Sequence, residues 1–408
     1  MAESKFTAAF CGWKDHQLGT VGHPDDNPAA VWIELIPDPD RVLICSGCRG
    51  VADGIHDQTD RWVRDLPMFG MQTDLLVHRC RVRCSKCGPR LEALDWLSPY
   101  ARVTDRLAES VARLCKLLPV KHVAQFYNLG WDAVKAIDKA YLDRTLGPVD
   151  LTGVTQLAMD EFAIQKGHRY ATVVIDPSTR RVLWVGRGNG REDVRPFFTD
   201  LLGPAGCKQI QAVAMDMNAS FDLEVKMHCP NAQVVYDLFH VVAKYGREVV
   251  DRVRVDQANQ LRHDKPARQL IKRSRWLLLR NAENIEKETD RIKLAELLKV
   301  NRSLAKVYIL KDDLKELWDY RHTGYARRFW EDWYHRAIHS RIEPLKTFAR
   351  KLKGYLPGIL SHCNHPLNTS VLEGINNKIK VIKRMAYGYR DDAYFFLKIR
   401  QAFPGNAG

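Results

Sequence analysis

The sequence predicts a mixed α/β fold, in which a sheet-containing core is combined with a long helical segment and a cysteine-rich module. Three observations support this prediction. Three strand-like segments within residues 155–187 are followed by alternating helices and strands up to about residue 253. Residues 255–355 have helical periodicity and many lysines and arginines. Two Cys-x-x-Cys pairs occur before residue 90, far from the other strand-like segments.

Composition restricts the function classes. The chain has 408 residues, enough for two or three domains, and 45% of them are hydrophobic, enough for packed cores. The formal net charge of +14 predicts a polyanionic partner, because each neutralised phosphate releases condensed counterions. The first residues lack the apolar segment of a signal peptide, and no run of about 18 apolar residues occurs. We therefore expect a cytoplasmic, DNA-associated protein without a membrane segment.

The paired cysteines predict a zinc site. Cys45 and Cys48 form one Cys-x-x-Cys pair, and Cys84 and Cys87 form the other. Each spacing lets two thiolates reach one ion from a tight turn, so two pairs complete a tetrahedral structural site. The 35 residues between the pairs exceed the common ribbon spacing, so this loop must contain its own strands. The competing ligands within the loop are His78 and Cys80.

Residues 75–83 alternate well enough to form one of these strands. Arg79, Arg81 and Arg83 follow every second position, so they make one side of the strand basic. We expect Arg81 and Arg83 to contact DNA, with an ordinary solvated face as the alternative. Residues 31–36 form another possible strand, but most of the segment 1–40 cannot be assigned.

A helix-turn-helix is predicted after the zinc module. Thr104 caps a helix over 105–117, and a short helix over 120–127 is joined by the turn Asn128-Leu129-Gly130 to a second one over 131–139. The inward apolar positions are Val123, Ala124, Leu129, Val134 and Ile137. The second helix of such a motif enters the major groove, which makes Lys135 and Lys139 candidate DNA contacts.

Two strands each carry a carboxylate to their end. In the segment 155–164, period-two alternation places Asp160 and Glu161 on opposite faces, so both cannot line one site. Strand 210–216 ends at Asp216. Three antiparallel strands followed by alternating helix and strand is the order of the ribonuclease H fold, in which the first and fourth strands are parallel neighbours. The two aspartates would then lie about 5 Å apart, which requires a cation such as Mg²⁺ or Mn²⁺ between them.

Several other carboxylates compete for a role in this site. Asp176 precedes a proline and suits a turn, and Asp222 and Glu224 lie on a following helix, where we expect them to be solvated. Asp237 ends the fifth strand near His240. This pair is predicted either to contact the metal ligands and hold them in position or to cap the next helix.

A third acidic residue, Glu373, stands at the head of a strongly basic helix that runs toward Lys383. Such a helix would deliver the last metal ligand while its cations hold the phosphate backbone. The residues predicted to contact DNA here are Asn377, Lys378, Lys380, Lys383 and Arg384. Asn376 shares the helix face of Glu373. The helical segment before it contains Trp276, Trp318, Trp330 and Trp333, for which core packing is favoured over stacking on extruded bases.

The pattern as a whole resembles the bacterial insertion-sequence transposases of the ISL3 family, of the DDE type. The resemblance runs from about Cys45 to Phe403. The motifs that carry it are Cys45-x-x-Cys48 with Cys84-x-x-Cys87-Gly88, Asp65-Leu66-Pro67, Met159-Asp160-Glu161-Phe162-Ala163, Met215-Asp216-Met217, Asp237-Leu238-Phe239-His240, Leu372-Glu373-Gly374-Ile375-Asn376-Asn377-Lys378 and Ala386-Tyr387-Gly388-Tyr389-Arg390. The chain departs from the family at Pro89, where an aromatic residue is common.

The resemblance implies a function and its residues. Asp160, Asp216 and Glu373 would be the catalytic triad and would hold two Mg²⁺ or Mn²⁺ ions for DNA strand cleavage and strand transfer. A structural Zn²⁺ would be bound by the four paired cysteines. The partners would be double-stranded DNA, as terminal inverted repeats and target, and a second copy of the chain in a homodimer. The location would be the bacterial cytoplasm, at the nucleoid.

These expectations define a domain plan. An unassigned segment, 1–40, precedes a zinc-binding module at 41–100 and a helix-turn-helix domain at 101–148. A ribonuclease H-like core of the retroviral integrase type, 149–254 and 356–408, is interrupted by an all-helical insertion at 255–355. Two alternatives remain: a ribonuclease H-like nuclease that cuts without joining, and an inactive DNA-binding regulator.

Overall fold

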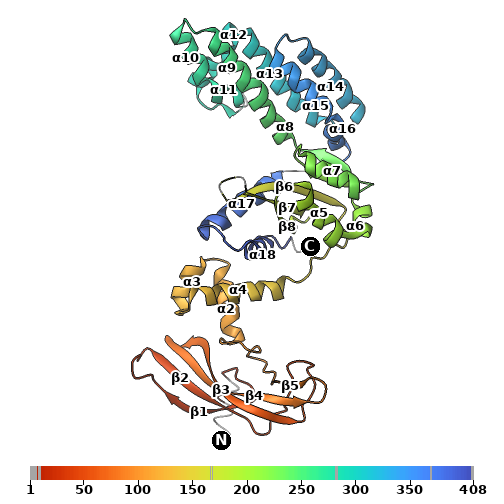
Figure 1. Ribbon diagram of the computed structural model, residues 1–408. Helices are drawn as coiled ribbons and strands as arrows, with labels where there is room; N and C mark the ends of the chain where they lie inside the picture. Colours follow the sequence, from red (N-terminus) through yellow and green to blue (C-terminus); the bar gives the residue numbers. More distant parts are fainter. Residues whose placement is uncertain are drawn as a thin grey trace. The chain divides into compact units, whose positions relative to one another are not determined.

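The structure, a computed structural model, describes residues 7, 11–165, 167, 169–280, 284–367 and 370–405. The chain forms two compact units, one of residues 1–147 with 384–387 and one of residues 148–383 with 388–408. Figure 1 shows the helices and strands of both units, with labels where there is room. In the described part of the chain, no helix is long and apolar enough to cross a membrane.

A five-stranded sheet dominates the first unit. Its strands are β1 (His16–Gly22), β2 (Ala30–Pro37), β3 (Gly54–Met68), β4 (Met71–Cys84) and β5 (Gly88–Leu91). The order is β1-β2-β4-β3, with β5 paired to β4. Phe69 and Gly70, which join β3 to β4, have φ values of 52° and 80°, a turn geometry that matches the twist of a two-residue hairpin. The strands expected at 31–36 and 75–83 are confirmed, and β1 and β2 belong to this same sheet.

Three helices follow the sheet, and they confirm the predicted helical hairpin. They are α2 (Asp105–Cys115), α3 (Val120–Tyr127) and α4 (Trp131–Leu146). Thr104 caps α2 by accepting a hydrogen bond from the Leu107 backbone N–H. Asn128 ends α3 in the left-handed conformation, with φ of 50°, which turns the chain toward α4. Val123 and Val134 are fully buried against α2, as the apolar pattern predicted.

Asp65 joins the sheet to these helices. It is 1% exposed and lies on β3, within the Asp-Leu-Pro motif. Its carboxylate accepts hydrogen bonds from Trp13 Nε1 at 2.8 Å, Thr104 Oγ1 at 2.6 Å and Arg106 Nε at 2.7 Å. Because Thr104 and Arg106 belong to the start of α2, this buried ion pair fixes the helical hairpin to the sheet.

A second five-stranded sheet lies in the other unit. Its strands are β6 (Gln156–Gln165), β7 (Arg169–Asp176), β8 (Arg181–Arg187), β9 (Ala212–Met215) and β10 (Gln233–Tyr236), in the order β10-β9-β6-β7-β8. β7 is antiparallel to β6 and β8, whereas β9 is parallel to both β6 and β10. The expected parallel contact between the first and fourth strands of this sheet is therefore present.

Helices cover both faces of this sheet (Figure 1). Leu157 and Met159 of β6 pack on one face with Phe197 and Phe221. The helical segments that follow β8 and β9 on this side are α5 (Arg191–Pro196), a π-helical turn (Phe197–Leu202), α6 (Gly203–Gln209) and α7 (Ala219–His228). On the opposite face, Ala158 and Phe162 pack against α17 (Ser370–Met385) and α18 (Asp392–Ala402). Alternation along β6 thus separates the two cores.

Between β10 and α17 the described chain is helical, as expected for residues 255–355. The helices are α8 (Leu238–Tyr245), α9 (Asp251–Gln260), α10 (Lys265–Arg273), α11 (Arg275–Leu279), α12 (Glu288–Val300), α13 (Arg302–Glu316), α14 (Thr323–Ile338), α15 (Glu343–Lys353) and α16 (Leu356–Leu360). Trp330 and Trp333 are buried and stacked on each other, and Trp318 packs on His362. Core packing is therefore confirmed for these three, but Trp276 is 67% exposed.

Candidate active site and DNA-binding surfaces

Three elements bring one carboxylate each to a single cavity. Ala158 of β6 is in register with Ala214 of β9, so Asp160 and Asp216 both lie two residues beyond an aligned pair of parallel strands. Glu373 comes from the first turn of α17. All three residues line a cavity of about 940 Å³. Asp160 and Asp216 are 56 positions apart in the sequence, and Glu373 follows Asp216 by 157 positions, yet all three line one cavity.

The two strand-borne aspartates are short of positive charge. Burial raises the pKa of Asp160 to about 6, and the neighbouring Asp216 adds to this shift. Burial also raises the pKa of Asp216. His240 opposes both shifts by its positive field. Among the described residues, the buried Oδ1 atom of Asp216 has no hydrogen-bond partner. An uncompensated pair of this kind suits an oxygen-liganded divalent cation.

Asp160 is held by two donors. Its Oδ1 accepts a hydrogen bond from the Glu161 backbone N–H at 2.8 Å, and its Oδ2 accepts one from Asn376 Nδ2 at 2.6 Å. Glu161 points to the other face, where Asn189 Nδ2 donates to its Oε2 at 2.5 Å. The opposite orientations of Asp160 and Glu161 follow from strand alternation, as the sequence predicted.

Asp176 serves a turn, also as predicted. Its Oδ1 accepts hydrogen bonds from the Ser178 N–H and hydroxyl, and its Oδ2 accepts one from Thr179 Oγ1. These local bonds hold the pKa of Asp176 below its usual value although burial opposes them. Asp176 does not line the cavity of Asp160.

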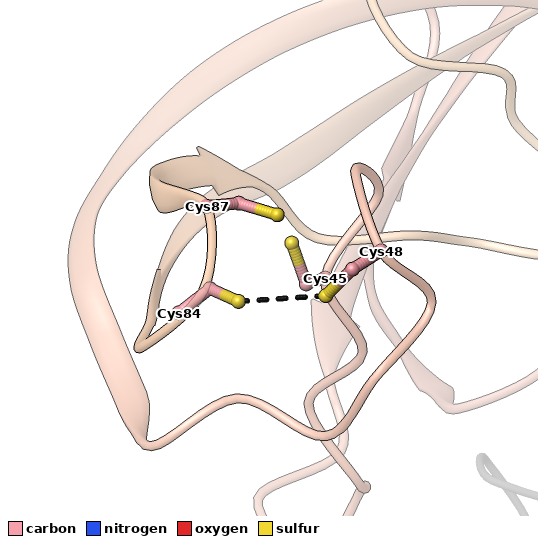
Figure 2. Close-up of side chains that lie close together, drawn as sticks. All are labelled: Cys45, Cys48, Cys84 and Cys87. Atoms are coloured by element: carbon pink, nitrogen blue, oxygen red, sulfur yellow. Dashed lines mark hydrogen bonds between the residues drawn. The ribbon is translucent and has the colours of Figure 1, made fainter.

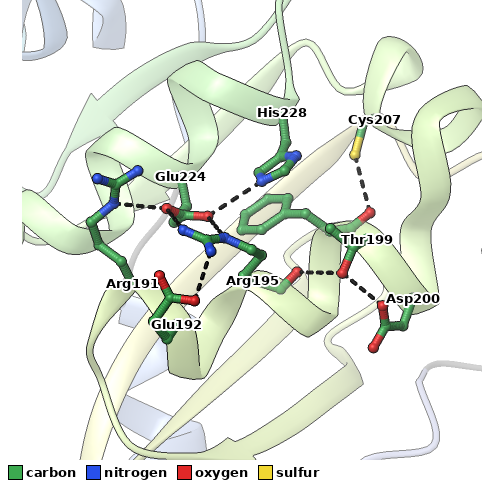
Figure 3. A network of polar contacts seen from close by, with 9 residues as sticks. Arg191, Glu192, Arg195, Thr199, Asp200, Cys207, Glu224 and His228 are labelled. Atoms are coloured by element: carbon green, nitrogen blue, oxygen red, sulfur yellow. Dashed lines mark hydrogen bonds and ion pairs between the residues drawn. The ribbon is translucent and has the colours of Figure 1, made fainter.

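The expectation that Glu224 is solvated is wrong. Figure 3 shows its side chain among Arg191, Arg195 and His228. Glu224 is 0% exposed, and its carboxylate accepts hydrogen bonds from Arg191 Nε at 2.8 Å and from Arg195 Nε at 3.1 Å. The physical reason is that α7 packs on α5, and this contact pairs the buried acid with the two arginines. Asp222 is half-buried and bonded to Lys226 and Tyr236, so it is not simply solvated either.

Asp237 and His240 also line the cavity. Asp237 Oδ1 caps α8 by accepting the Phe239 N–H at 2.8 Å, and its Oδ2 lies 3.8 Å from His240 Nε2. The Asp237 N–H donates to the Met215 carbonyl at 3.2 Å, next to Asp216. Asp237 is therefore observed to cap a helix, which was one of its two predicted roles. The same side chain lies beside His240, which lines the cavity with Asp160 and Asp216.

The basic face of α17 is divided between two environments. Asn377 and Lys380 line the cavity together with Glu373 and Asn376. Lys378 Nζ donates to the Ala402 carbonyl at 3.2 Å, and Lys383 Nζ donates to the Ala163 carbonyl at 2.9 Å. Arg384 is exposed. Only Asn377 and Lys380 of the five predicted contacts thus lie beside the carboxylates.

The helical segment contributes further cavity residues. Arg247, Arg275, Trp276 and Lys315 line the cavity together with the strand ends. Of these, the sequence analysis named only Trp276, for which it favoured core packing, and the exposure of that side chain makes this expectation wrong. Arg275 lies 5.3 Å from the centroid of the Trp276 ring. The abundance of lysine and arginine in residues 255–355 was the available signal, but helical periodicity alone does not identify the face that meets the sheet.

Four sulfur atoms gather at one end of the first sheet (Figure 2). The Sγ atoms of Cys45, Cys48, Cys84 and Cys87 all lie within 4.8 Å of one another, and Cys48 Sγ is 3.5 Å from Cys84 Sγ. Hydrogen bonds from the Cys48 and Gly47 backbone lower the pKa of the Cys45 thiol to about 7. The two competing ligands, Cys80 and His78, lie outside this cluster. Arg41 donates a hydrogen bond to Cys80, and His78 contacts Asp60 and Glu34.

The basic side predicted for β4 is only partly present. Arg81 and Arg83 are exposed, and Arg81 is paired with Asp57. Arg79 is 2% exposed and donates to the Glu92 carbonyl at 3.2 Å, so its expected place on the basic side is wrong. The chain just after β5 passes beside Arg79, and the side chain is enclosed by the segment that carries Glu92. Exposed basic residues near the cysteines that the sequence reasoning did not single out are Arg49, Lys86 and Arg90.

On the helical hairpin, Lys135 and Lys139 lie one turn apart on α4 and are half-exposed. Lys135 Nζ lies 5.8 Å from the centroid of the Trp131 ring. Trp131 and Phe126 are themselves exposed, at 49% and 69%. The first turn of α4 therefore presents both cationic and aromatic groups.

Comparison with family profiles gives the class of protein, a transposase of the DDE type. Three family profiles match in consecutive order: a zinc finger of the transposases IS204/IS1001/IS1096/IS1165 at residues 41–87, the helix-turn-helix domain of transposase family ISL3 at 92–142, and an ISL3 transposase domain at 157–399. The chain belongs to the ISL3 family of DNA-binding insertion-sequence transposases, as the motifs predicted.

Two relatives illustrate the range of similarity. The transposase for insertion sequence element IS1001 of Bordetella parapertussis is 53% identical over 408 residues, all of both chains. The transposase for insertion sequence element IS1557 of Mycobacterium tuberculosis is 27% identical over 332 residues, 76% of this chain and 74% of its own. The similarity to the first relative thus spans every element described above.

Proposed function

We propose that Asp160, Asp216 and Glu373 are the catalytic residues of this transposase and together hold two Mg²⁺ or Mn²⁺ ions. The observation that carries the proposal is their convergence on one cavity from β6, β9 and α17. The buried Asp216 Oδ1, without a partner among the described residues, fits such a cation. Bound divalent ions supply Lewis-acid activation of the attacking hydroxyl and stabilise the departing 3′ oxygen.

The protein's own groups would orient the scissile phosphate. Lys380 and Asn377, on the face of α17 that carries Glu373, would hold neighbouring phosphates of the DNA backbone. Arg247 and Arg275 would contact the same strand from the opposite wall. Asp237 would keep His240 close to the catalytic carboxylates. No side-chain nucleophile is required, because water and then a DNA 3′-OH attack phosphorus directly.

The strand order supports a ribonuclease H-like core of the integrase type. We assign that core to residues 149–254 and 356–408, with the all-helical insertion at 255–355. The parallel β6 and β9 in the centre of the sheet support this assignment, since the fold requires its first and fourth strands to be neighbours. The insertion would then supply the second wall of the cavity.

The first unit would read the ends of the element. In this proposal residues 41–100 form the zinc module and 101–148 the helix-turn-helix domain. Four thiolates at about 2.3 Å from one zinc ion have sulfur separations of about 3.8 Å, which the observed cluster accommodates within its 4.8 Å. The DNA contacts proposed in this unit are Lys135 and Lys139 of α4 and Arg81 and Arg83 of β4. Those proposed on α17 are Lys378, Lys383 and Arg384, of which the first two belong to the other unit.

Cleavage at both ends, followed by joining to a target, would require two copies of the chain on paired terminal inverted repeats. The test is a supercoiled donor plasmid with paired ends, a target plasmid and Mg²⁺. Joined products support the proposal. Cut products without joining would indicate a nuclease, and end binding without cutting would indicate a regulator, so either result would overturn it.

A further inference from the structure

Asn376 is a buried polar residue of the cavity. It is 8% exposed and lies one turn after Glu373 on α17. Its Nδ2 donates to Asp160 Oδ2 at 2.6 Å. Its Oδ1 is buried and has no hydrogen-bond partner among the described residues, although the side chain lines the cavity. A buried amide oxygen without a partner is destabilising, so its presence requires an explanation.

We propose that Asn376 has two functions at this site: its amide nitrogen fixes the orientation of Asp160, and its amide oxygen is a neutral ligand for a divalent cation. This inference rests on the proposed metal site and extends it by one residue. Amide oxygens are ordinary ligands for hard divalent ions. A neutral fourth oxygen adds a ligand without adding repulsion among the three carboxylates.

The two atoms of the amide act on different partners. With Glu161 N–H on Oδ1 and Asn376 Nδ2 on Oδ2, the Asp160 carboxylate cannot rotate without losing a hydrogen bond. Since Asn376 belongs to α17, this bond also links the helix that carries Glu373 to the strand that carries Asp160. The amide therefore sets the separation between two ligands that come from distant parts of the sequence.

Asn377 is the matched control. It follows Asn376 on the same helix and lines the same cavity, but it is exposed, and its Oδ1 accepts a hydrogen bond from Lys380 Nζ at 3.3 Å. Replacing Asn377 should weaken DNA binding without changing the affinity for metal. Replacing Asn376 should weaken metal binding without changing the affinity for DNA. Both substitutions, Asn376→Leu and Asn377→Leu, change volume and polarity equally.

The experiment measures Mn²⁺ binding to the DNA-free protein by electron paramagnetic resonance of the free ion. Loss of an outer or auxiliary ligand typically costs 10–100-fold in metal affinity, so we expect a rise in Kd of about that size for Asn376→Leu and less than about twofold for Asn377→Leu. Asn376→Ser, which keeps a small polar group, should give an intermediate Kd and guards against misfolding of the leucine variant.

Asn376→Asp separates the two functions. It keeps the oxygen ligand but loses the donor to Asp160, so Mn²⁺ should bind at least as tightly as in the wild type while cleavage at saturating Mn²⁺ falls. If the wild type binds Mn²⁺ and Asn376→Leu binds it with the same Kd, this inference is overturned and the proposed triad stays intact. A wild type without saturable Mn²⁺ binding would overturn both.

Discussion

Glu224 lies on α7, and Asp216 lies eight positions earlier, just before that helix. The surroundings of the two carboxylates nevertheless shift their pKa values in opposite directions. Glu224 is surrounded by Arg191, Arg195 and His228. Burial alone would raise its pKa, but the hydrogen bonds from Arg195 and Arg191 outweigh burial and the pKa lies below its usual value. Burial raises the pKa of Asp216, and the largest opposing effect comes from His240.

The difference separates structural acids from functional ones. A carboxylate whose charge is balanced by the protein contributes to folding and has no capacity left for a ligand. A carboxylate that is buried without balance destabilises the fold unless a cation arrives. Cys87 of the thiol cluster resembles Asp216 in this respect, because hydrogen bonding to Cys48 and burial raise the pKa of its thiol to about 12.

The largest effect is expected at the thiol cluster. Zinc sites of this type bind with apparent free energies of about 10 kcal/mol or more at neutral pH, and that energy is folding energy. Cys84→Ser should therefore release zinc, which elemental analysis measures, and unfold the end of the first sheet. Cys80→Ser is the control, because Cys80 lies outside the cluster. Equal zinc content in both variants would contradict the assignment.

The next effect concerns catalysis. Asp216→Asn removes a metal ligand worth several kcal/mol in the transition state, so donor cleavage should fall roughly 10³-fold or more. End binding, measured by gel shift, should stay within about twofold of wild type because the DNA-reading unit is separate. The metal-free variant should also melt at a higher temperature, since an unbalanced buried charge is gone. Cleavage at the wild-type rate would refute the triad.

Glu224→Gln tests the balanced acid. Removing one partner of a buried ion pair leaves the arginines uncompensated and should lower the free energy of unfolding by about 3 kcal/mol, measured by urea denaturation. Glu192→Gln is the matched control: Glu192 also pairs with Arg195 but its side chain is 80% exposed, so a change below about 0.5 kcal/mol is expected. Similar losses in both variants would show that Glu224 is not special.

The smallest effect is a contrast in pH dependence. Between the unfolded value of 3.8 and the folded value of about 6, folded Asp160 binds more protons than unfolded Asp160, so its contribution to stability is lost as pH rises through this window. The lowered pKa of Glu224 has the opposite sign: its contribution is lost as pH falls below 4.5. The check is the melting temperature of the metal-free protein from pH 3 to 7. The advantage of wild type over Asp160→Asn should decrease as pH rises from about 4 to 6, and the advantage of wild type over Glu224→Gln should decrease as pH falls below 4.5.

Sequence reasoning named the three carboxylates that meet in one cavity, Asp160, Asp216 and Glu373, but not the contacts around them. Alternation along one strand is enough to separate Asp160 from Glu161, and the order of strands is enough to make Asp216 its neighbour. The partners of Glu224 lie on a helix 29–33 positions earlier, and no periodicity encodes that contact. Strand β3 escaped prediction because Gly54–Met68 is mostly polar and contains Pro67. The place of Arg275 and Trp276 in the cavity follows only from the packing of the helical segment beside the sheet.

The position of α17 near the end of the chain has a consequence for incomplete synthesis. A polypeptide that stops before Ser370 would contain the whole sequence of residues 1–147 and both strand-borne aspartates, but neither Glu373 nor Asn376. Under the proposed function, such a product would keep the DNA contacts proposed on β4 and α4 and lose one proposed metal ligand, so it would bind the ends of the element without cutting them. Premature termination of translation would thus yield a competitor of the full-length enzyme, which would restrain DNA cleavage.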